Sequence, residues 1–285
     1  MKTLSDRFGD DPMTNPLVYP GRIPEHSGLL LDGAYLRIEP RPGRPPGEWA
    51  VKTEDGTVTV DRRLRLIGGA PVASRHCVAA VGSNASPSQM HRKFAGRSVR
   101  AAFPMLLAEV HGISPGVSAH ISRWGYIPAT PVVSAGRASR LFLLWLDDEQ
   151  LTALDATEPN YHRRLLPGDG FPAFLESGDR LPACFVYVGK HGCLTDEAGS
   201  PWPLRDQASL IQDLLDSSPA LRSLCGSTPS EFLDSVRNPA TREAAYRIIH
   251  ATGRVRRQPE LSRLPRSTDL AVPPGAVSSP PTSPS

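Results

Sequence analysis

The sequence has no hydrophobic run long enough to cross a membrane. Spanning the hydrocarbon core takes roughly 18 or more consecutive apolar residues, and no stretch of this chain approaches that length. The polar segment from Met1 to Asp11 also lacks the apolar core of a secretory signal peptide. We therefore expect neither a membrane protein nor a secreted one.

Lysine and paired cysteines are also scarce. Only 4 of the 32 basic residues are lysines, a bias typical of a GC-rich bacterial genome. The net charge of +3 is too small to indicate a nucleic-acid partner. The four cysteines form no C-x-x-C pair, which is typical of reduced thiols in the cytoplasm. We predict a cytoplasmic protein that binds neither nucleic acid nor membrane.

Several familiar site motifs are missing. The sequence contains no P-loop, no G-x-G-x-x-G fingerprint and no H-E-x-x-H zinc motif. His191 and Cys193 come nearest to a metal-binding pair, but two ligands do not make a site. We therefore predict that the protein uses no metal and no cofactor.

Proline is abundant but unevenly placed, and it divides the chain. The 24 glycines and 30 prolines make up about 19% of the 285 residues, below the roughly 25–30% typical of wholesale disorder. After residue 258, however, 7 of the last 27 residues are prolines. We predict an extended arm (1–27), an N-terminal β-hairpin region (28–72), a core (73–200), a C-terminal helical region (201–258) and a disordered tail (259–285).

Strand and helix signals mix within the core. Apolar runs predict strands at 76–81, 139–146, 161–166 and 183–188. Asp147 and Gln150 form a capping-box signal for a short helix after the second of these strands. Earlier in the chain, two predicted strands flank a hairpin turn at residues 55–56. After residue 201, apolar residues recur with the spacing of an amphipathic helix. The fold class predicted from these patterns is α+β.

The first segment that suggests chemistry follows the strand at 76–81. Val81-Gly82-Ser83-Asn84-Ala85 breaks the strand just before a helix predicted at 88–94. Backbone N–H groups in such a loop can converge on a carboxylate or a developing oxyanion. Gly-Ser-Asn is also ordinary turn chemistry, and spacing alone favours that interpretation.

The second segment is Leu154-Asp-Ala-Thr-Glu-Pro-Asn-Tyr161. Glu158 lies where a short helix ends and close to a new strand. Its carboxylate is either a positioned base or a solvated helix-end group, and position alone favours the latter. Asp155 is interpreted as structural, and Tyr161 either lines a pocket or packs as a strand aromatic.

Taken together, the two segments resemble a known family. Val81–Ala85 resembles the Tyr-Gly-Ser-Asn-Leu loop of the γ-glutamylcyclotransferase-like superfamily, which includes the AIG2-like proteins. Residues 142–161 are similar to that family's second signature, an apolar strand and short helix followed by Leu-Asp-x-x-Glu and a tyrosine. The order and the spacing of 75 residues between Ser83 and Glu158 are also similar. The resemblance covers residues 74–195.

The resemblance implies a fold and an activity. The fold would be a compact mixed β-barrel with flanking helices, to which this chain adds N-terminal strands and a C-terminal helical region. In the implied reaction, the α-amine of a γ-glutamyl compound attacks its own γ-carbonyl, which releases 5-oxoproline and an amine or amino acid. Glu158 matches the catalytic glutamate, and a single carboxyl group can move both protons when burial raises its pKa towards neutrality. The Gly82–Ala85 amides would anchor the glutamyl group.

The chain also departs from the family pattern. Val81 replaces the loop tyrosine, which removes a ring and a hydroxyl from one pocket wall, and Pro159 stands where glycine often follows the glutamate. We expect these two changes to affect substrate preference.

Two further functions stay open. A non-catalytic binding or regulatory module on the same fold is one, and an amide hydrolase that uses the same glutamate is the other. The helices at 201–258 could also form a homodimer.

Overall fold

The computed structural model describes residue 9, residues 11–54 and residues 56–266. Strands and helices are mixed along these residues, in agreement with the predicted α+β class. The strands are β1 (Gly28–Leu31), β2 (Ala34–Glu39), β3 (Ala50–Thr53), β4 (Gly56–Thr59), β5 (His76–Ala80), β6 (Ala102–Val117), β7 (Ala129–Leu146), β8 (Tyr161–Pro167), β9 (Ala173–Leu175), β10 (Arg180–Leu181), β11 (Ala183–Gly189), β12 (Cys193–Leu194) and β13 (Val255–Arg256). The helices are α2 (Val60–Arg65), α3 (Pro87–Phe94), α4 (Asp148–Asp155), α5 (Gln207–Ser217), α6 (Pro219–Cys225), α7 (Pro229–Val236), α8 (Pro239–Ala251) and α9 (Pro259–Ser262).

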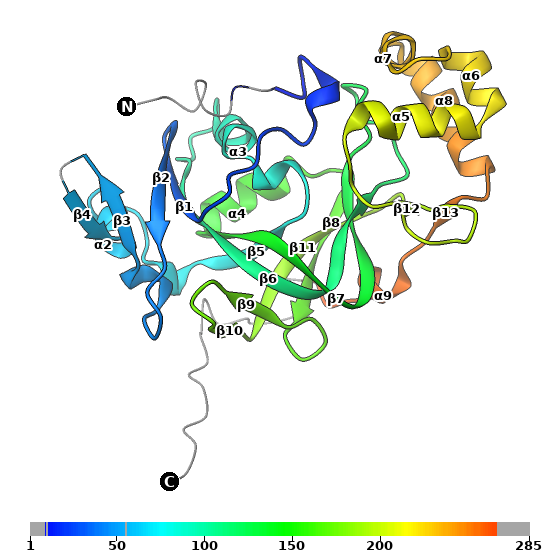
Figure 1. Cartoon of the computed structure of the whole chain (residues 1–285). Helices are drawn as coiled ribbons and strands as arrows, with labels where there is room; N and C mark the ends of the chain where they lie inside the picture. Colours follow the sequence, from blue (N-terminus) through cyan, green and yellow to red (C-terminus); the bar gives the residue numbers. More distant parts are fainter. Residues whose placement is uncertain (1–8, 10, 55, 267–285) are drawn as a thin grey trace.

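An 11-stranded sheet occupies the centre of the molecule (Figure 1). Its main path runs β4-β3-β2-β1-β6-β7-β5-β11-β8, with β9 paired to β6 and β10 to β9. Within this sheet of described residues, β5 and β11 pair in parallel and the other pairs are antiparallel. The sheet is therefore mixed, as the resemblance implied.

The predicted β-barrel is not closed. The path of the sheet has two separate ends, at β4 and at β8. Strands β1–β4 extend the sheet on one side of β6, away from β8. The outer edge of β8 is covered by the segment after α9. There the Leu165 N–H donates to the Pro265 carbonyl at 3.0 Å, and the backbones of Arg164 and Arg266 form an isolated antiparallel β-bridge. Because this segment occupies the edge of β8, that strand does not pair onward to close a barrel.

Two hydrophobic cores cover the two faces of the sheet. Successive residues of β5 divide between them, with Val78 in one and Cys77 in the other, because side chains alternate across a strand. The core of Val78 includes Phe94 of α3 and Leu154 of α4. The core of Cys77 includes Leu64 of α2. Helices α3 and α4 therefore pack on the same face, and each lies next to one of the two predicted site segments.

A third core holds the C-terminal helices together. Helices α5–α8 gather at one end of the molecule and pack on Val117 and Ile127, at the two ends of the β6–β7 connection (Figure 1). Polar side chains cap two of these helices: Thr228 and Glu231 form a capping box at the start of α7, and Asn238 caps α8. No helix in the described part of the chain is long and apolar enough to span a bilayer.

Two stretches differ from the sequence prediction. The sequence contains two weak strand signals, at 117–121 and 131–134. Val117 ends β6 and residues 118–121 follow it, whereas 131–134 lie inside β7. The two strands form a long antiparallel pair of 16 and 18 residues. A register shift between His111 and Gly112 lets this pair continue through its irregular middle. Ordered structure also continues past residue 258, because Leu261 of α9 is fully buried in the sheet core. Residues 267–285 of the predicted tail lie outside the described residues.

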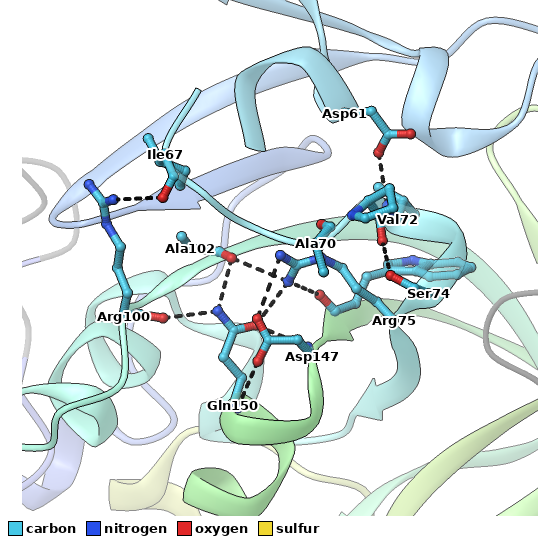
Figure 2. Close-up of polar contacts among 12 residues, drawn as sticks. Asp61, Ile67, Ala70, Val72, Ser74, Arg75, Arg100, Ala102, Asp147 and Gln150 are labelled. Atoms are coloured by element: carbon cyan, nitrogen blue, oxygen red, sulfur yellow. Dashed lines mark hydrogen bonds and ion pairs between the residues drawn. The ribbon is translucent and has the colours of Figure 1, made fainter. Parts of the chain in front are cut away.

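A buried arginine ties α4 to the sheet (Figure 2). The Arg75 guanidinium is fully buried and donates to the Ala70, Ala102 and Trp145 carbonyls at 2.9, 3.3 and 3.2 Å. It also donates to Gln150 Oε1 at 2.9 Å and lies 3.7 Å from Asp147 Oδ2. Because Asp147 and Gln150 form the capping box of α4, this network fixes the start of the helix that leads to Glu158.

Candidate active site

Three separate segments of the chain meet at one small cavity. They are the loop after β5, the turn after α4 and the N-terminal arm. The cavity is lined by Tyr19, Ala79, Val81, Gly82, Ser83, Asn84, Ala129, Glu158, Tyr161 and Tyr187. The two segments that the sequence singled out therefore face the same space.

The loop after β5 needs glycine at position 82. A Cβ atom there would lie 2.6 Å from the Tyr19 hydroxyl and 2.8 Å from Ala129 Cβ, closer than side chains tolerate. The short 3-10 helix Ser83–Ala85 follows and leads into α3. Within this turn the Ala85 N–H donates to the Gly82 carbonyl at 2.9 Å. The amide of Ala85 is thus engaged inside the loop, whereas the residues Gly82, Ser83 and Asn84 line the cavity.

Glu158 is held in a turn directly after α4. Its N–H donates to the Asp155 carbonyl, and its own carbonyl accepts from the Tyr161 N–H, both at 3.0 Å. The Glu158 side chain is only 10% exposed. A carboxylate so shielded from water interacts strongly with its neighbours, so Glu158 differs from the solvated helix-end group that position alone favoured.

Two side chains bind the same oxygen of Glu158. Asn84 Nδ2 donates to Oε1 at 3.1 Å, and Lys93 Nζ lies 2.5 Å from that atom. Lys93 also donates to Asn84 Oδ1 at 2.6 Å. The loop after β5, helix α3 and the turn after α4 are therefore joined at this carboxylate.

Two tyrosines form a wall around Ala129. The Ala129 N–H donates to the Tyr19 hydroxyl, and the Tyr161 hydroxyl donates to the Ala129 carbonyl, each at 2.8 Å. Burial raises the pKa of both phenols, and the charge of Glu158 raises them further. Both hydroxyls are therefore neutral over the physiological pH range, and they serve as fixed dipoles rather than as bases.

A broad groove leads outward from the cavity. The two share Tyr19, Ser83, Glu158 and Tyr161. Of the described residues that line the groove, Glu158 is the only one with a carboxylate, against four basic side chains, those of Arg92, Lys93, Arg97 and Arg123. The groove therefore carries an excess of positive charge beside one buried carboxylate.

No protein-family model and no curated protein matches the sequence. Among solved structures, the chain matches a γ-glutamyl cyclotransferase at 18% identity over 41% of this chain and 67% of that one, with a TM-score of 0.32. An uncharacterized Homo sapiens protein matches at 18% identity over 41% and 68% of the two chains, with a TM-score of 0.34. A protein from Arabidopsis thaliana matches at 16% identity over 53% and 89%, also with a TM-score of 0.34.

The function proposed below rests on the geometry of the site itself.

The predicted site residues fall into two groups. Glu158, Val81, Gly82, Ser83, Asn84 and Tyr161 all line the cavity. Ala85 does not, because it is buried in the hydrophobic core on the α3 face. Asp155, predicted to be structural, accepts two hydrogen bonds from Arg163 at 3.0 and 2.8 Å and one from the Tyr187 hydroxyl at 2.7 Å. Its role is to fix the end of α4.

The sequence prediction missed Tyr19 and Lys93. Tyr19 belongs to the predicted extended arm, yet it is buried and stacks on Tyr126 with ring centroids 4.3 Å apart. It supplies a ring and a hydroxyl to the cavity that Val81 lacks. The signal for Tyr19 was an aromatic residue within a proline-rich arm. The signal for Lys93 was its place in a run of basic residues at the end of a predicted helix.

The sequence prediction also left out a serine motif in strand β6. Residues 112–116 match the G-x-S-x-G spacing of a nucleophile elbow. That motif requires a sharp turn between a strand and a helix, whereas Ser114 lies inside strand β6. Ser114 is therefore no nucleophile of that type. The described residues also contain no cluster of three or more His, Cys, Asp or Glu side chains arranged to hold a metal.

Neighbouring imidazoles beside the groove make stability depend on pH. The His120 and His191 ring centroids lie 4.4 Å apart, and burial together with the neighbouring His191 and His250 lowers the pKa of His120 to about 3. Below about pH 6.5 the unfolded chain binds a proton that the folded His120 refuses, so the free energy of unfolding falls by roughly 1 kcal/mol per pH unit towards pH 3. Urea unfolding at several pH values should show a shallower fall for His120→Asn. Parallel curves for the variant and the wild type would refute this linkage.

Proposed function

We propose that the protein is a γ-glutamylcyclotransferase-type enzyme in which Glu158 is the acid and base. The observation that carries the proposal is the shielded Glu158 carboxylate, 3.1 Å from Asn84 of the glycine loop, in a cavity lined by both motifs. A single carboxylate fixed next to a polar loop suits a reaction that needs proton transfer and no external nucleophile.

The reaction balances with this one group. Glu158 takes a proton from the substrate's α-ammonium, and the freed amine attacks the γ-carbonyl to form the five-membered ring. Glu158 then gives the proton to the leaving nitrogen as the C–N bond breaks. The attacking nitrogen still carries one proton more than a lactam nitrogen, and it passes this proton to the departing amine directly or through solvent. The products are 5-oxoproline and an ammonium ion, and Glu158 ends in its starting state.

Neighbouring groups would orient the substrate. The amides of Gly82, Ser83 and Asn84 are candidates to bind the carboxylate or the developing oxyanion of the glutamyl half. The hydroxyls of Tyr19 and Tyr161 are already committed to Ala129. Their rings are therefore rigid walls, and rigid walls hold the amine near the carbonyl that it attacks.

The decisive experiment is detection of 5-oxoproline by mass spectrometry with a panel of γ-glutamyl compounds. The panel should pair each amine that carries a carboxylate with a neutral analogue. Reactions run in ¹⁸O-labelled water separate the two rival functions: labelled glutamate among the products would indicate an amide hydrolase. The absence of turnover on every compound would instead favour a binding module.

The basic groove predicts a preference within this panel. Arg123 lines the groove with its guanidinium 4.7 Å from the Trp124 ring centroid, and the ion pairs of the described residues include none to Arg123. We expect Arg123→Gln to raise KM for substrates with an anionic amine half by roughly two- to fivefold, the range of an exposed charge pair. KM for the neutral analogues should not change. Equal increases for both classes would show that Arg123 does not recognise charge.

A further inference from the structure

Lys93 occupies a central position in the site, although the family resemblance assigns it no role. It lies on the last turn of α3, and its Nζ is 2.5 Å from Glu158 Oε1 and 2.6 Å from Asn84 Oδ1. Because Asn84 also donates to Oε1, the three side chains form a closed triangle in which each contacts both others. A triangle of this kind restricts the rotamers of all its members.

The Lys93–Glu158 pair is shielded, unlike a typical surface pair. The two side chains are 21% and 10% exposed. Lys52 and Glu39 lie at the same distance of 2.5 Å, but their side chains are 60% and 41% exposed. Since exposure to water and salt weakens a charge pair, the contact between Lys93 and Glu158 is less screened than the contact between Lys52 and Glu39.

The choice of lysine at this position runs against the composition of the chain. Arginine supplies 28 of the 32 basic residues. Two of the described lysines nevertheless lie at the turn after α4. Lys93 contacts Glu158, and Lys190 donates to the carbonyl of Pro159, the residue after Glu158, at 2.6 Å. A compact ammonium fits between a carboxylate and an amide oxygen, whereas a planar guanidinium requires a wider arrangement. The geometry of the site therefore accounts for lysine here.

We propose that Lys93 is a positioning residue for Glu158: together with Asn84 it holds Oε1, so that Oε2 is the carboxylate oxygen that exchanges the proton with the substrate. This proposal rests on the proposed function, since it assigns Glu158 the role of base. Lys93 itself neither gives nor takes the transferred proton. It holds the carboxylate in one orientation.

The test begins with a readout that does not require activity. The side-chain carboxyl of Glu158 is followed by NMR in protein labelled with ¹³C-glutamate, for the wild type, Lys93→Met and the control Lys52→Met. Loss of an opposite charge makes protonation easier, so we expect the Glu158 titration midpoint to move up by about 1 pH unit or more in Lys93→Met. Lys52→Met, which removes the same charge from an exposed pair, should leave it unchanged.

Kinetics on an active panel compound complete the test. The acidic limb of the kcat/KM profile should move to higher pH in Lys93→Met by the same amount as the NMR midpoint. Lys93→Arg retains the charge, so its Glu158 titration midpoint should lie close to that of the wild type. Its kcat should lie between those of Lys93→Met and the wild type, because the guanidinium has a different geometry. An unchanged midpoint in Lys93→Met, or an equal shift in Lys52→Met, would overturn the role of Lys93. Failure of the wild type to release 5-oxoproline from any compound would overturn the proposed function itself, and it is detected before any variant is made.

Discussion

Glu158→Gln should reduce kcat for 5-oxoproline release by roughly 10²–10⁴-fold, the usual contribution of a general acid–base group. Glutamine has the shape of glutamate, and its carbonyl oxygen can still accept from Asn84 and Lys93. It cannot take the proton of the substrate amine. The fold and the binding of substrate should therefore survive while the chemical step fails. The rate of 5-oxoproline formation at saturating substrate measures this loss.

A matched control comes from the helix that precedes the site. Glu149 is exposed in the first turn of α4, so Glu149→Gln makes the same chemical change on the same element without touching the cavity. We expect this variant to turn over at the wild-type rate. Equal rates for Glu158→Gln and the wild type would remove Glu158 from the acid–base role, whatever the fold suggests.

The second large effect concerns stability rather than activity. Arg75→Met should lower the free energy of unfolding by roughly 3–5 kcal/mol, the cost of removing one partner from a buried ionic network. The lost guanidinium bonds three carbonyls and Gln150, and none of these can turn to solvent in the core. Urea unfolding followed by circular dichroism measures the change.

An exposed ion pair provides the comparison for Arg75. Arg44 and Glu48 lie 3.3 Å apart with side chains 66% and 51% exposed. Arg44→Met should cost at most about 1 kcal/mol, since water replaces the lost contact. A similar loss of stability in the two variants would contradict the role assigned to the Arg75 network.

The site was predictable where it depends on neighbours in sequence. The run of 76–81 followed by Gly-Ser-Asn predicts a strand that breaks into a loop, and β5 ends at Ala80. Asp147 and Gln150 predict a capped helix, and α4 has both bonds of that capping box. Each of these features is set by contacts within a few residues, which a local pattern can reveal.

The composition of the flanking segments was less informative. Proline marked residues 1–27 as an extended arm, but Tyr19 inserts between the loop after β5 and Ala129. Residues from 259 onward looked equally unstructured, but Leu261 is buried. A single large side chain can bury enough apolar surface to hold a proline-rich segment on a core, and average composition does not register it.

The sequence by itself determined the class of the fold, the two loops and the glutamate at the end of α4. Only the tertiary structure decided what surrounds that glutamate. Asn84 and Glu158 are 74 residues apart, Lys93 and Glu158 are 65 apart, and Tyr19 and Ala129 are 110 apart. The packing of α3 and α4 on the same face of one sheet brings the first two pairs together, and the arm brings the third. Such contacts depend on how whole elements pack, so the proposed acid–base site can form only once the sheet and its helices are assembled.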